Sequence, residues 1–95
     1  MKLRLTRRAR SDIEQIVEYL HARSPSGARN VLASVIRTLD AIGAMPEASQ
    51  RTDRPNVRVR IVTRYGYKIF FSISGDSIDI LHVRHSRRMP WSRTQ

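Results

Sequence analysis

Residues 57–84 read VRVRIVTRYGYKIFFSISGDSIDILHVR, and this stretch decides the fold. Apolar and polar residues alternate here in three runs, Val57 to Ile61, Lys68 to Ile73 and Ile78 to Arg84. Alternation with a period of two is typical of strands that bury one face. Tyr65-Gly66 and Ser74-Gly75-Asp76-Ser77 supply turns between the runs. We therefore expect two hairpins that form a contiguous antiparallel meander.

Two helices are expected before the meander. Ile13, Ile16, Val17 and Leu20 fall at i, i+3, i+4 and i+7, and a second apolar stripe runs from Ala28 to Ile42. Between them, Ser24 suits an N-cap with Pro25 at the first helical position, and Gly43 marks the expected end of the second helix. For the first helix two N-caps are open: Thr6, or Ser11 in a capping box with Glu14.

A short strand is expected at the N-terminus, where Leu3 and Leu5 alternate with polar residues, and residues 44–56 read as a connector. The predicted order is β-α-α-β-β-β over a single domain of residues 1–95, with residues 90–95 as a basic tail. This order predicts the α+β class, with both helices packed on one face of a mainly antiparallel sheet. If the Val59 side of its strand faces the helices, Arg58 and Arg60 lie on the opposite face.

The charge of the chain favours a polyanionic partner. Lys and Arg number 18 against eight Asp and Glu, and residues 51–95 carry ten of these cations but only three acids. Arg dominates, and its planar fork suits phosphate and carboxylate groups. There is no Cys and no apolar run long enough to cross a membrane, so we expect a cytoplasmic protein that contacts no membrane.

Three stretches resemble the RelE/ParE superfamily, the toxins of bacterial type II toxin–antitoxin systems. They are residues 5–13, where a strand meets a helix, residues 59–71, with a cation before an apolar-aromatic run, and residues 80–88, a last strand with a basic end. The resemblance spans nearly the whole chain. Within it, the spacing of Leu81, His85, Arg87 and Arg88 is more similar to the ParE branch.

The resemblance implies a toxin that arrests growth, and it favours ParE-like poisoning of DNA gyrase. The alternative is a RelE-like endoribonuclease that cuts mRNA on the ribosome without a metal, so whether the chain is an enzyme depends on the branch. A third possibility is a non-toxic nucleic-acid-binding module. Against it, the expected helices carry four of the eight acids, whereas a recognition helix is normally basic.

The resemblance also implies site residues. If the chain is RelE-like, the catalytic set comprises Arg58, Arg60, Lys68, Arg84 and His85. Contacts to the target or to nucleic acid are expected from Arg64, Arg87, Arg88 and Trp91. RNA cleavage needs a base, an acid and cations around one phosphate, and His85 has a suitable ordinary pKa of about 6.5. Trp91 stands where RelE-like chains carry a Tyr, and it has no acidic proton to transfer.

No metal or other cofactor is expected. His82 and His85 are three residues apart, which in a strand places them on opposite faces, and no Cys or acidic cluster completes a metal site. His82 lies between Leu81 and Val83, so a structural role is expected for it. The expected partner is a cognate antitoxin with an acidic segment that folds on binding.

Overall fold

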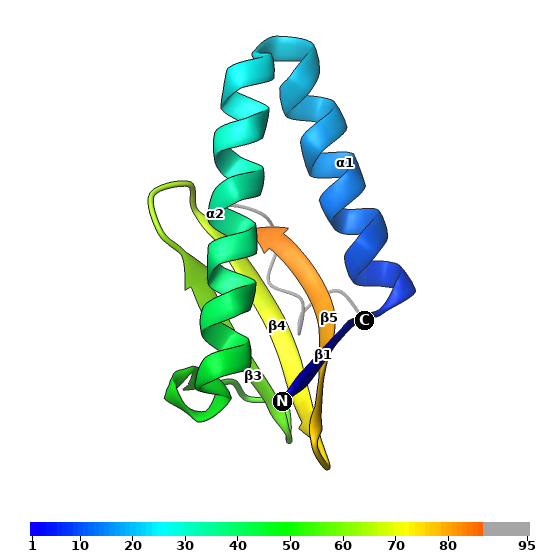
Figure 1. The fold of residues 1–95 in the computed structure, drawn as a ribbon, viewed down its shortest axis with the longest axis vertical. Coiled ribbons are helices and arrows are strands. Elements are labelled where there is room, and N and C mark those ends of the chain that lie inside the picture. Colours follow the sequence, from blue (N-terminus) through cyan, green and yellow to red (C-terminus); the bar gives the residue numbers. More distant parts are fainter. Residues whose placement is uncertain (87–95) are drawn as a thin grey trace.

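The chain folds as a helical hairpin packed on one face of a five-stranded sheet (Figure 1). The computed structural model describes residues 1–86. Its elements are β1 (Lys2–Leu5), α1 (Arg7–Arg23), α2 (Pro25–Ala44), a 3₁₀ turn η1 (Pro46–Ala48), β2 (Gln50–Arg51), β3 (Val57–Val62), β4 (Tyr67–Ser74) and β5 (Ser77–His85). The predicted α+β order is confirmed, with the short strand β2 added inside the connector.

Local sequence determines where the two helices begin. Thr6 is the N-cap of α1, because its hydroxyl oxygen accepts a hydrogen bond from the Ala9 amide at 3.1 Å. The hydroxyl of Ser11, the other candidate cap, instead accepts a hydrogen bond from the side-chain amide of Gln15, one turn later. Ser24 caps α2, with Pro25 at its first position as expected.

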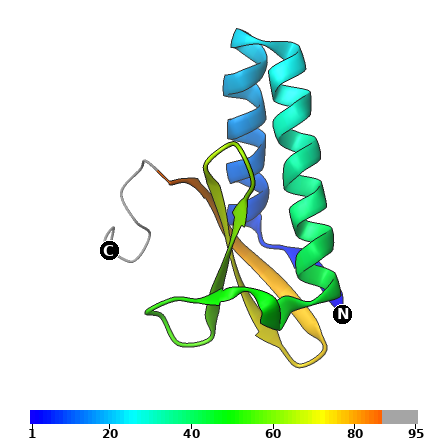
Figure 2. The ribbon, with the colours of Figure 1, turned by 90° about the vertical axis from the view of Figure 1, so that its left-hand side faces the viewer.

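The sheet has the strand order β1-β5-β4-β3-β2. Only β1 and β5 are parallel, and the other neighbours form the antiparallel meander. The core lies between the sheet and the helices, where β4 and β5 contribute the fully buried residues Ile69, Phe71, Ile78 and Ile80. Figure 2 shows both helices on one side of the sheet and no helix of the described residues on the other side.

The facing of β3 differs from the sequence expectation. In the β3–β4 register Val62 pairs with Tyr67, Arg60 with Ile69 and Arg58 with Phe71. These β4 residues are buried beneath the helices, so Arg58 and Arg60 share the helix side of the sheet. Val57, Val59 and Ile61 take the opposite face. The expectation that Arg58 and Arg60 lie opposite the helices is wrong.

A bulge changes the phase of β5. Phe71 pairs with Ile80 and Phe70 with His82, which leaves Leu81 as the extra residue. Ile78 and Ile80 therefore face the helices before the bulge, and Val83 faces them after it. Among residues 1–86, the outer edge of β5 has no strand partner beyond Ile80, because β1 ends at Leu5 and the chain turns into α1.

Candidate functional site

Two cations lie directly opposite each other on the face of the sheet that no helix covers. Lys68 on β4 pairs with Arg84 on β5, and Ile61 on β3 lies on the other side of Lys68 in the same row. Ile61 is 58% exposed, unusually high for an isoleucine in a sheet. Within residues 1–86 neither cation has a carboxylate partner. Like charges directly opposite destabilise a sheet, so this row suits an anionic partner with an apolar component.

Arg58 and Arg60 are engaged in holding the connector. One Arg58 nitrogen donates to the carbonyl of Ser49 at 3.0 Å and to that of Glu47 at 3.4 Å. Arg60 donates to the hydroxyl of Ser49, a buried side chain, at 3.3 Å. These bonds satisfy polar groups of η1 and of the segment that follows it. The two arginines thus lie on the opposite face of the sheet from Lys68 and Arg84.

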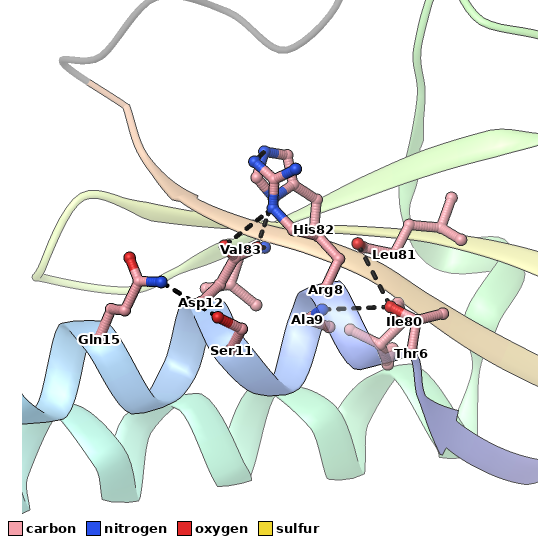
Figure 3. Close-up of polar contacts among 10 residues, drawn as sticks. All are labelled: Thr6, Arg8, Ala9, Ser11, Asp12, Gln15, Ile80, Leu81, His82 and Val83. Atoms are coloured by element: carbon pink, nitrogen blue, oxygen red, sulfur yellow. Dashed lines mark hydrogen bonds and ion pairs between the residues drawn. The ribbon is translucent and has the colours of Figure 1, made fainter.

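A partly buried polar cluster joins α1 to the outer edge of β5 (Figure 3). One oxygen of Asp12 accepts hydrogen bonds from the Val83 amide at 3.0 Å and from His82 Nδ1 at 2.5 Å. The other oxygen pairs with Arg8 Nε at 3.1 Å. The Asp12 carboxylate therefore occupies the place of a neighbouring strand at an edge amide that would otherwise lack an acceptor.

His82 is 3% exposed in this cluster. Burial lowers its pKa below the ordinary value of 6.5, and this effect outweighs the opposing influence of Asp12. The contacts assign one tautomer: Nδ1–H donates to Asp12, and Nε2 accepts from the Arg8 guanidinium at 3.3 Å. This geometry agrees with the structural role that was expected for His82 from its apolar neighbours.

His85 lies on the helix side of the sheet, whereas His82 belongs to the opposite face. It pairs with Tyr67, and the two rings meet edge to face with centroids 5.0 Å apart. Arg84 and His85 both line a groove of about 690 Å³ between α1 and the end of β5. Arg8, Asp12, Tyr19 and His82 also line this groove. The five residues proposed for RelE-like catalysis thus divide among the connector, the open face and this groove.

Arg64 lies exposed at the turn between β3 and β4, in the left-handed region with φ of 83°. For a non-glycine residue this conformation is uncommon, and such strain concentrates at functional positions. The Ser86 amide donates to the Gly66 carbonyl at 2.6 Å, so β5 ends beside the same turn. Arg87, Arg88 and Trp91, the other residues expected to contact a target, lie outside the described residues.

Sequence reasoning missed the partners of His82. Arg8 and Asp12 precede it by 74 and 70 positions, and no local pattern connects them. One signal was available, an Asp in the first turns of a helix that otherwise presents apolar residues to the sheet. Ile61 was also missed as an exposed residue, because its strand was given the opposite facing.

Comparisons with known proteins agree with this architecture. The model of the family "ParE toxin of type II toxin-antitoxin system, parDE" matches residues 3–90. A structure of the chromosomal ParDE system from P. aeruginosa has a TM-score of 0.81 at 20% identity, covering 90% of this chain and 95% of that one. The isolated E. coli RelE toxin has a TM-score of 0.64 at 13% identity, covering 93% and 86% respectively.

A search among curated proteins found no match. Among residues 1–86, no helix has the length and apolarity needed to cross a membrane. The two structural likenesses, at such low identity, establish the fold alone, whereas the family match extends over nearly the whole chain. The chain belongs to the ParE toxin family of type II toxin–antitoxin systems, within the RelE/ParE superfamily.

Proposed function

We propose that this toxin arrests growth by poisoning DNA gyrase and that it does not cleave mRNA. The observation that carries the proposal is the division of the cationic residues between the two faces of the sheet. Cleavage by 2′-hydroxyl attack needs cations and proton-transfer groups converging on one phosphate. Here Arg58 and Arg60 are bonded to the connector on the helix side, while Lys68 and Arg84 lie on the other face. Of the five candidate catalytic residues, only Arg84 and His85 line a common groove.

We further propose that the row of Ile61, Lys68 and Arg84 contacts the target. An exposed isoleucine beside two unpaired cations fits a protein surface that is apolar at its centre and acidic at its rim. Arg64 lies in the turn between β3 and β4, at the same end of the sheet as this row. For Arg87, Arg88 and Trp91, which lie outside the described residues, contact with the target stays an expectation from the sequence.

The proposed partner is a ParD-like antitoxin with an acidic segment. Its acids would neutralise the unpaired cations, and an apolar helix of the antitoxin would cover apolar side chains of the toxin. The helical hairpin offers such a surface, a shallow depression of about 450 Å³ lined by Ile13, Val17 and Leu32. Binding there leaves the open face of the sheet accessible to acidic residues of the same antitoxin.

Induced expression in a bacterium tests the proposal when growth, the SOS response and mRNA integrity are followed together. Gyrase poisoning predicts arrest with SOS induction and filamentation, with mRNA intact, and rescue by the antitoxin. Arrest with rapid mRNA cleavage and no SOS response would instead establish a RelE-like activity, and His85 would then become the first candidate for proton transfer.

A further inference from the structure

A second pair of like charges faces each other at the far end of β3. Arg51 on β2 is the direct partner of Arg58 on β3. Within residues 1–86 neither has a carboxylate within ion-pair distance. Because directly opposed like charges destabilise a sheet, a bound anion would relieve this repulsion. The pair lies at the other end of β3 from Arg64, so it is separate from the surface proposed for the target.

The loop between β2 and β3 is held in one shape by its own hydrogen bonds. The Thr52 hydroxyl accepts from the Arg54 amide at 3.1 Å and donates to the Val57 carbonyl at 2.9 Å. Two backbone bonds, from Thr52 to Val57 and from Val57 to Arg54, close the same turn. Asn56 has φ of 64°, which an asparagine tolerates better than most residues. The loop is therefore preorganised.

This loop borders an open pocket of about 350 Å³ whose lining includes three arginines. Arg51, Arg54 and Arg58 line it, with Asp53 as the one acid among its lining residues. Arg58 is fixed by its bonds to the carbonyls of Glu47 and Ser49, so its charge stays beside the pocket. Guanidinium groups bind phosphate oxygens through paired N–H donors, and Thr52 and Asn56 add uncharged polar groups to the lining.

We propose that this pocket binds the backbone phosphates of duplex DNA. None of the nine residues that line it is aromatic, whereas recognition of single-stranded nucleic acid relies on aromatic stacking. Six of the nine lining residues are polar or charged, three of them arginines, which favours an anion over the apolar side of an antitoxin helix. Figure 2 shows this loop projecting from one end of the sheet.

The test measures binding of the purified chain to a fluorescent duplex of arbitrary sequence, without gyrase, by anisotropy at several NaCl concentrations. The variant Arg51→Gln/Arg54→Gln is compared with Arg10→Gln/Arg29→Gln, which removes the same charge from exposed helix positions. The pocket variant is expected to bind about ten-fold more weakly, and its slope of log K against log[salt] should shrink by about 1.8, or about 0.9 for each lost phosphate contact. The helix variant should stay within about three-fold of the wild type.

Equal losses in the two double variants would overturn the proposal, because only net charge would then matter. The single variant Arg51→Gln guards against misfolding, since this exposed side chain has no hydrogen bond to the described residues, and it should lower the slope by about 0.9. Polyglutamate that competes as well as duplex DNA at equal charge would also overturn the assignment and identify an acidic-peptide site. The assay contains no gyrase, so its result is independent of the proposed poisoning.

Discussion

Asp12 is the residue on which the contact between α1 and β5 depends. Its carboxylate accepts from a backbone amide and an imidazole and pairs with a guanidinium, at an edge where no strand follows β1. A buried donor left without an acceptor is costly, because it lost its water on folding and gains nothing in return. This single side chain therefore replaces the backbone bond that a neighbouring strand would make with the Val83 amide.

Replacing Asp12 with Ala should lower the free energy of unfolding by about 2–4 kcal/mol, because the Val83 amide and the buried His82 both lose their acceptor. Urea unfolding at pH 7 measures the loss. Asp40→Ala, at an exposed position of α2, is the matched control and should cost less than about 0.5 kcal/mol. Equal costs at the two positions would show that the cluster contributes no stability.

His82 makes the stability depend on pH. Its pKa in the folded protein lies below the value of about 6.5 in the unfolded chain, so between these values the unfolded chain binds more protons. The free energy of unfolding should therefore fall as the pH is lowered from 7.5 to 5.5, by at most about 1.4 kcal/mol for each unit of pKa depression. His82→Gln should flatten this slope. A wild-type protein that becomes more stable over the same range would show that Asp12 raises the pKa instead.

At the scale of elements, the pairing of β4 with β5 includes a repulsion between two like charges that does not stabilise the sheet. Lys68 and Arg84 are cross-strand partners with no acid between them in the described part of the chain. In a sheet selected for stability alone, one of the two would be neutral or acidic. The row is better explained as a surface kept for a partner.

Lys68→Gln should leave the free energy of unfolding unchanged or raise it by up to about 1 kcal/mol, because it removes the repulsion. The same variant should lose most of its ability to arrest growth. Lys2→Gln, an exposed cation on β1, loses the same charge and should stay toxic. A folded Lys68→Gln variant that arrests growth as strongly as the wild type would exclude this row from target binding.

The elements themselves could be predicted from the sequence, but the facing of β3 could not. Its run VRVRIV ends with two adjacent apolar residues, Ile61 and Val62, so either face of the strand can be read as the buried one. The register with Tyr67 buries Val62 and exposes Ile61, and the Arg58 and Arg60 side chains then find acceptors in the connector. Those acceptors are carbonyls and a hydroxyl in an irregular segment. The periodicity of the sequence gives no information on where such groups lie.

At the scale of the whole molecule, the order of helices and strands was predictable because each segment carries its own period, cap or turn. For the candidate site, the sequence named Lys68 and Arg84 for RelE-like catalysis and Arg64 for contact with a target, and these roles stay predictions; the structure places all three at one end of the sheet. It could not group the cations by face, since that depends on strand register and on the bulge at Leu81. Contacts across 70 residues, such as that of Asp12 with His82, lie beyond any local pattern.

We propose that this ParE-family toxin acts on gyrase and does not cleave RNA. The most direct test incubates the purified chain with gyrase, ATP and supercoiled plasmid, and in parallel with translating ribosomes and mRNA. Linear plasmid that stays covalently attached to gyrase, together with intact mRNA, is the predicted result. An unchanged plasmid and mRNA cut on the ribosome would contradict the claim.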